Sequence, residues 1–152
     1  MVARSVRWDV LLACIALIVF SSSQTSPKLQ AQTNASASKW EAEIAGFEAS
    51  DKTNLPPKGA VLFVGSSSIR LWKTLAKDFA GYEVINRGFG GSQLADSVVL
   101  ADRIVIAYAP KMVLLYAGDN DIAAGKTPEQ VFSDFKRFVE KVHSELPKTR
   151  TF

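Results

Sequence analysis

Two short, continuous apolar runs constrain the fold of this 152-residue chain more than any other feature. Residues 60–64 (AVLFV) and 112–116 (MVLLY) show no alternation between apolar and polar positions. A strand without alternation has both faces buried, which is typical of a central strand in a parallel sheet covered by helices. Residues 82–86 (YEVIN) predict another short strand between these two.

Segments with helical spacing of apolar residues separate the predicted strands. They predict helices over residues 38–51, 66–75, 92–108 and 127–146, although residues 104–106 fit an extended segment equally well. Thr127-Pro128-Glu129-Gln130 is the clearest helix start, because Thr caps, Pro suits the first position and Gln completes a capping box. Alternating helices and strands predict an α/β fold with a parallel, doubly wound sheet. We expect this sheet to be truncated after the third strand and the following helix, which would leave the third strand as an apolar edge.

The first 31 residues have the layout of a signal peptide. Arg4 and Arg7 precede an apolar run over residues 10–20, and small polar residues follow it. Such a run is about 16 Å long as a helix, roughly half of a bilayer core. We therefore expect a secreted or periplasmic protein with no membrane span after cleavage, and an uncleaved membrane anchor is the alternative. Residues 32–55 are expected to form a linker and a short helix that begins with a capping box at Ser38.

Composition and charge exclude several classes of protein. A chain that is 47% apolar with a net charge of +3 is typical of an ordered globular domain. Without residues 1–31 the chain has 15 basic and 14 acidic residues and no clustered basic face, so we expect no nucleic-acid partner. The single cysteine, Cys14, lies in the predicted leader, which excludes disulfides and cysteine metal sites from the mature chain.

Three polar or glycine-rich clusters follow the predicted strands, at residues 65–68, 88–91 and 118–121. In an open parallel sheet, ligands bind beyond the carboxyl ends of the strands, so these clusters are expected to converge. A serine at a strand-to-helix turn, glycines that expose backbone N–H groups and an asparagine amide together suit a nucleophile beside an oxyanion hole. Taken singly, the clusters also fit a helix cap, a weak phosphate loop or a cation site. A nucleophile elbow is absent, because Ile69 stands where its second glycine belongs.

In this order, residues 62–72, 86–92 and 116–121 resemble the first three blocks of the SGNH hydrolases, also called GDSL-type esterases. The resemblance implies a partial hydrolase-type domain over residues 56–152 with a flavodoxin-like, three-layer α/β/α sandwich. It implies hydrolysis of carboxylic esters through an acyl-enzyme, with no metal or organic cofactor. Ser67 would be the nucleophile, and the Gly91 backbone N–H and the Asn120 side-chain amide would stabilise the oxyanion. The family's Gly-Asp-Ser reads Gly65-Ser66-Ser67 here, and that Asp is not part of the family's triad.

The general base of the family comes from a late Asp-x-x-His block, which this chain does not contain. Its one histidine, His143, has Glu140 rather than Asp three residues before it, and we interpret it as a partly exposed helix residue. Three explanations stay open: a piece of a longer hydrolase, a non-catalytic module that binds esters or sugars, or a chain completed by a partner. The substrate, whether an acyl ester, an acetylated sugar, a lysophospholipid or a thioester, and the oligomeric state stay open as well.

Overall fold

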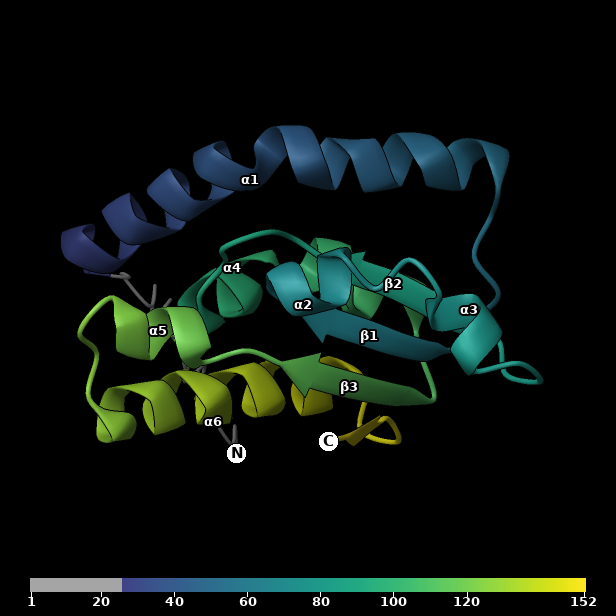
Figure 1. The fold of residues 1–152 in the computed structure, drawn as a ribbon. Helices are drawn as coiled ribbons and strands as arrows, with labels where there is room; N and C mark the ends of the chain where they lie inside the picture. Colours follow the sequence, from purple (N-terminus) through teal and green to yellow (C-terminus); the bar gives the residue numbers. More distant parts are fainter. Residues whose placement is uncertain (1–25) are drawn as a thin grey trace, which may run out of the picture.

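The computed structural model describes residues 26–152 and arranges them around one sheet (Figure 1). The elements, in chain order, are α1 (Pro27–Thr53), β1 (Val61–Gly65), α2 (Ser67–Arg70), α3 (Leu75–Asp78), β2 (Val84–Gly88), α4 (Leu94–Ile104), the 3-10 helix η1 (Ile106–Tyr108), β3 (Met112–Tyr116), α5 (Asp119–Ala123), α6 (Pro128–Glu145) and β4 (Arg150–Thr151). Over residues 26–152, no helix is both long and apolar enough to cross a bilayer.

The sheet has four strands in the order β2-β1-β3-β4, and every pairing is parallel. This confirms the predicted α/β class with a parallel sheet. All five residues of β1 are buried, as a central strand without alternation requires. Gly65 at the end of β1 pairs with Gly88 of β2 and Tyr116 of β3, so the three strands end at one level.

Helices cover both faces of the sheet, but unequally. On one face, Leu62 and Val113 pack in a large core with Ile44 of α1, Ile104 of α4 and Phe138 of α6. The opposite face has a smaller core, in which Val61 and Phe63 meet the apolar side chains of the short helices α2 and α3. The sheet is thus a middle layer between helices, as the resemblance implied.

The N-terminal helix differs from its prediction. Helix α1 begins at Pro27, and Ser38 lies inside it, so the expected linker over residues 32–37 is helical and no capping box starts there. Proline suits the first turn of a helix, and residues 28–45 contain no Gly or Pro to interrupt it. Trp40 and Ile44 are buried at helical spacing, as expected. The predicted leader over residues 1–31 stays a prediction, because residues 1–25 lie outside the described part of the chain, while residues 27–31 form the start of α1.

The helix predicted over residues 66–75 is instead two helices of four residues each, α2 and α3. The Asp78 carboxylate accepts hydrogen bonds of 2.6 Å from Trp72 Nε1 and from Thr74 Oγ1, which holds the turn between them. The turn brings Trp72 and Phe79 edge-on to Phe63 of β1. Tertiary packing of the aromatic rings therefore overrides the helical periodicity.

Helix α4 is capped by Gln93 rather than by Ser92, because Gln93 and Asp96 form the capping box. It ends at Ile104, and Ala109, with φ +43°, then closes η1 in the left-handed region. The predicted start of α6 is confirmed, since Thr127 Oγ1 accepts from the Gln130 N–H at 3.4 Å and the Gln130 side chain bonds back at 2.8 Å.

Strand β3 is not the edge of the sheet, contrary to expectation. Arg150 and Thr151 of β4 pair with Met112 and Val113, and the Leu115 N–H donates to the Phe152 carbonyl at 2.9 Å. The last residues of the chain thus satisfy backbone groups of β3 that would otherwise be unpaired.

Candidate active site

The three polar clusters meet at the carboxyl edge of the sheet. The Ser66 N–H donates to the Tyr116 carbonyl at 3.3 Å, which ties the turn after β1 to the end of β3. The Phe89 N–H donates to the Gly65 carbonyl at 3.0 Å, which ties the same turn to the loop after β2. The edge is therefore one hydrogen-bonded surface built from three loops, as the convergence argument predicted.

Ser67 is the first residue of α2 and is half-buried. The turn before it depends on Gly65, because a Cβ at that position would lie 2.0 Å from the Tyr116 carbonyl oxygen. Ser66, where the family resemblance would place Asp, is wholly buried. Because α2 has a single turn, its dipole supports negative charge near Ser67 less than a long helix would.

Gly91 is exposed in the loop after β2, with φ +74° in the region that favours glycine. The loop is anchored by the buried Ser92, whose Oγ donates to the Phe89 carbonyl at 2.9 Å. Trp40 of α1 packs edge-on to Phe89, with ring centroids 5.4 Å apart. Helix α1, which lies outside the region of family resemblance, therefore supports the loop that carries Gly91.

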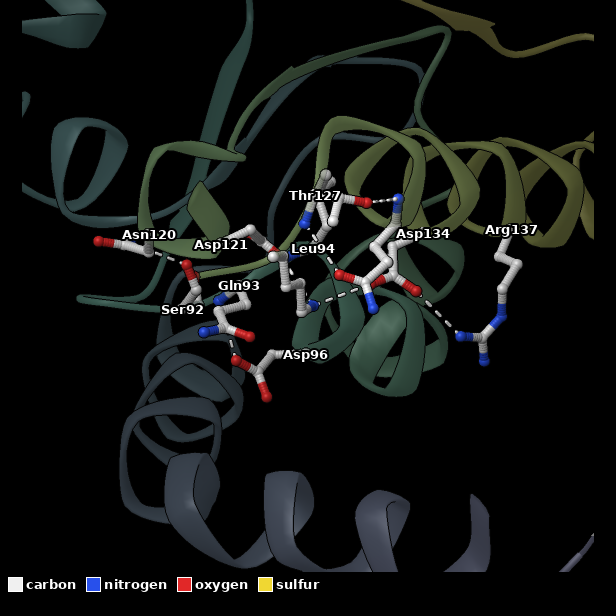
Figure 2. Close-up of polar contacts among 11 residues, drawn as sticks. Ser92, Gln93, Leu94, Asp96, Asn120, Asp121, Thr127, Asp134 and Arg137 are labelled. Atoms are coloured by element: carbon white, nitrogen blue, oxygen red, sulfur yellow. Dashed lines mark hydrogen bonds and ion pairs between the residues drawn. The ribbon is translucent and has the colours of Figure 1, made fainter. Parts of the chain in front are cut away.

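Asn120 is the second residue of α5 and is half-buried. Its Nδ2 donates to the Ser92 carbonyl at 2.9 Å, so the cluster after β3 contacts the residue next to Gly91 (Figure 2). A carboxamide nitrogen carries two protons, so one N–H remains after this bond. The structure thus joins Asn120 directly to the Gly91 loop and joins Ser67 to both through the Gly65–Ser66 turn.

His143 lies in the last turn of α6 and is exposed, which confirms its interpretation as a helix-surface residue. Its Nε2 is 3.4 Å from Thr151 Oγ1 of β4. Helix α6 begins beside α5 and runs alongside β3 (Figure 1), so His143 lies ~22 Å along the helix from Pro128. Among the described residues, the side-chain partner of His143 is thus Thr151 of β4, and no hydrogen bond joins His143 to Ser67.

The sequence assigned no role to Arg70, and it suggested Asp121 only as part of a possible cation site. The Arg70 guanidinium lies against Gly90, where an added Cβ would be 2.8 Å from its Nε, and Glu43 of α1 pairs with it at 3.5 Å. Its position one turn after Ser67 is the signal that could have found it. Asp121 is fully buried beside Asn120 and pairs with Lys126 at 2.8 Å.

The charge on Lys126 is maintained by its surroundings. Burial lowers the pKa of Lys126, but hydrogen bonds to Asp121 and Asp134 outweigh that effect and hold the pKa above its ordinary value. Asp121 is thus bonded to a cationic side chain, which argues against the cation site considered for residues 119–121. Within residues 26–152, no group of three or more His, Cys, Asp or Glu side chains is placed to hold a metal ion.

Comparison with solved structures identifies one recurring fold. A Streptococcus pneumoniae protein, provisionally described as a platelet activating factor, matches with a TM-score of 0.66 and 17% identity over 84% of this chain and 59% of its own. A GDSL-like lipase from Bacteroides thetaiotaomicron matches with a TM-score of 0.61 and 20% identity over 72% of this chain and 56% of its own. A psychrotrophic esterase from a Pseudoalteromonas species matches with a TM-score of 0.52 and 20% identity over 62% of this chain and 57% of its own.

This chain thus spans between a half and three fifths of the length of these three structures. No protein-family model matches the sequence, and no curated protein sequence matches it significantly. The likeness therefore concerns the fold, and an SGNH-hydrolase family esterase is among the matching structures. The described residues have the α/β fold of the SGNH, or GDSL-type, hydrolases.

Proposed function

We propose that this chain carries the nucleophile and the oxyanion-stabilising groups of a serine-dependent carboxylic ester hydrolase. The main support for the proposal is the hydrogen bond of 2.9 Å that Asn120 Nδ2 donates to the Ser92 carbonyl. This bond places the Asn120 amide next to Gly91, on the same sheet edge as the turn that presents Ser67. A nucleophile and two convergent donors at the carboxyl ends of parallel strands are the parts that acyl transfer requires.

In the proposed reaction, Ser67 Oγ attacks the ester carbonyl carbon and the carbonyl π electrons move onto oxygen. The Gly91 N–H and the remaining Asn120 N–H donate to this oxyanion, and each is expected to lower the barrier by roughly 3–4 kcal/mol. A base such as added imidazole takes the Ser67 hydroxyl proton during the attack and gives it to the alcohol oxygen, whose bond to carbon breaks as the tetrahedral intermediate collapses. Water then attacks the acyl group on Ser67 and releases the carboxylic acid.

The described residues place no histidine beside Ser67 to accept its proton, because His143 lies in the last turn of α6. A serine hydroxyl without a base is a poor nucleophile at neutral pH, although oxyanion stabilisation retains a residual rate of about 10³–10⁴ over water. We therefore expect slow turnover by the chain alone and a faster rate when a small base such as imidazole is added.

The test is hydrolysis of p-nitrophenyl acetate by residues 1–152, with and without imidazole, compared with the Ser67→Ala variant. The expected result is a protein-dependent rate that rises with imidazole, an acetyl group on Ser67 detected by peptide mass spectrometry, and only the imidazole background for Ser67→Ala. Equal rates for the two proteins, with no adduct on Ser67, would refute the proposal.

A second candidate is a non-catalytic module that binds acyl or acetylated sugar esters, and the position of His143 favours it. This candidate requires that wild type and Ser67→Ala bind an acetylated sugar equally well while neither hydrolyses it. Calorimetric titration of both proteins, combined with the hydrolysis assay, separates the two functions.

The proposed location is outside the cytoplasm, after removal of residues 1–31. N-terminal sequencing of the protein recovered from periplasm or medium tests this, with a first residue near Gln32 as the expected result. Recovery of the full-length chain in the membrane fraction would favour the anchor instead.

A further inference from the structure

We propose that Asp121 is a positioning residue, which holds the start of α4, and with it the Gly91 loop, against the helix that carries Asn120. This inference rests on the proposed function, because it concerns the two groups expected to stabilise the oxyanion.

The Asp121 carboxylate is bonded to the first residue of α4. Asp121 is the third residue of α5 and is 0% exposed. Its Oδ2 and Oδ1 lie 3.0 Å and 3.3 Å from the Leu94 backbone nitrogen. The first N–H groups of a helix have no partner within the helix, so this carboxylate satisfies a buried donor that α4 itself cannot.

Asn120 and Asp121, adjacent in α5, thus hold both ends of a three-residue segment, residues 92–94 (Figure 2). Between these ends, the Gln93 N–H donates to Asp96 Oδ2 at 2.9 Å, which adds a third restraint on the segment. Gly91 directly precedes the segment and is the residue type with the most backbone freedom. The direction of its N–H therefore depends on how firmly the following residues are held.

The buried charge of Asp121 is compensated by a chain of ion pairs. Lys126 Nζ lies 2.8 Å from Asp121 and 2.9 Å from Asp134, and Arg137 pairs with Asp134 at 3.1 Å. A buried carboxylate is costly unless it is paired and hydrogen-bonded, and both conditions are met here. Both oxygens of the Asp121 carboxylate are acceptors, one facing Lys126 and both facing the Leu94 N–H. In asparagine one of these oxygens is replaced by an NH₂ group, which is a donor and would face another donor.

Two matched variants, Asp121→Asn and Asp134→Asn, test the proposal. Each removes a carboxylate bonded to Lys126, but only Asp121 contacts Leu94. In imidazole-assisted hydrolysis, Asp121→Asn is expected to lower kcat by about 10- to 100-fold with KM within about twofold. Asp134→Asn is expected to leave both constants within about twofold. Equal effects of the two variants, or a change confined to KM, would overturn the positioning role.

Amide hydrogen exchange measures the same role without turnover. In Asp121→Asn, the Leu94 backbone amide and the Asn120 side-chain amide are expected to exchange about tenfold faster, and in Asp134→Asn they are expected to exchange as in wild type. Unchanged exchange in Asp121→Asn contradicts the proposal. This measurement stays decisive if wild type shows no Ser67-dependent hydrolysis, an outcome that would refute the proposed function alone.

If Asp121→Asn does not fold, the Lys126→Gln variant tests whether the Asp121 carboxylate positions the start of α4. It removes the cation that holds the other side of the carboxylate and leaves Asp121 in place. Faster exchange at Leu94 in the folded Lys126→Gln protein supports the proposal, and exchange as in wild type overturns it.

Discussion

Gly65 illustrates how single residues control the site, because its backbone touches the neighbouring strand. A Cβ at Gly65 would lie 2.0 Å from the Tyr116 carbonyl oxygen, a backbone atom that cannot move independently of β3. Gly65→Ala is therefore expected to lower the free energy of unfolding by about 1–3 kcal/mol or more. Gly46→Ala is the control, since Gly46 lies inside α1 with no atom within 4 Å of an added Cβ. Urea unfolding of both variants measures this difference in stability, and equal unfolding midpoints would contradict the predicted loss in Gly65→Ala.

Asn120 permits a residue-scale prediction about catalysis. Asn120→Ala removes one proposed donor to the oxyanion, so imidazole-assisted kcat is expected to fall about 10²- to 10³-fold while KM changes little. Asn54→Ala, at the exposed end of α1, is the matched control and is expected to leave both constants unchanged. A rise in KM at constant kcat would instead assign Asn120 to substrate binding.

At the scale of elements, one arginine adds charged contacts between α1 and α4, which also share the larger core. Arg103 of α4 pairs with Glu41 and Glu48 of α1, each at 2.6 Å, and these hydrogen bonds lower the pKa of both carboxyls from 4.5. A lowered pKa in the folded state contributes stability that is present above the unfolded value and is lost as the pH falls through the folded value. The attachment of α1 should therefore weaken below about pH 4.5.

The corresponding experiment compares wild type with Arg103→Gln. Between about pH 5 and pH 3, the unfolding midpoint of wild type is expected to fall more steeply than that of the variant. The difference should be small, because both glutamates are largely exposed and such pairs are screened by solvent. Parallel curves would show that these ion pairs do not contribute to stability.

At the scale of the whole molecule, the two faces of the sheet differ in how completely they are covered. The face covered by α1, α4 and α6 has the larger core, in which Leu62 is 0% exposed. The face below α2 and α3 leaves a groove of about 370 Å³, lined by Phe63, Trp72, Leu114 and Tyr116 among others. Most of the burial energy of the sheet should therefore come from one face.

A pair of leucine variants tests this asymmetry. Leu62→Ala is expected to lower the free energy of unfolding by about 2–5 kcal/mol, and Leu114→Ala by clearly less, because Leu114 is already partly exposed. Both residues lie in neighbouring central strands and lose the same atoms, so backbone context is matched. Urea titrations that give equal losses would show that the groove face is as well covered as the other.

Much of the fold follows from local patterns in the sequence. The residues of β3 were predicted without error, β1 was predicted to within one residue, and the α6 capping box forms as expected. Ser67, Gly91 and Asn120 were expected at one sheet edge, and parallel strands of matched length bring their loops there. Their catalytic roles stay predictions.

The sequence by itself determined the alternation of buried strands and amphipathic helices, and with it the parallel sheet and the edge where the polar clusters gather. These properties depend on hydrophobic periodicity and on caps within a few residues. Only the tertiary structure decided the break between α2 and α3, the cap at Gln93 and the buried Asp121–Leu94 contact. Each of these results from contacts made after the elements pack, which no local window of sequence contains. The long-range bonds of Asp121 and Asn120, each spanning 27 or 28 residues, are the clearest example.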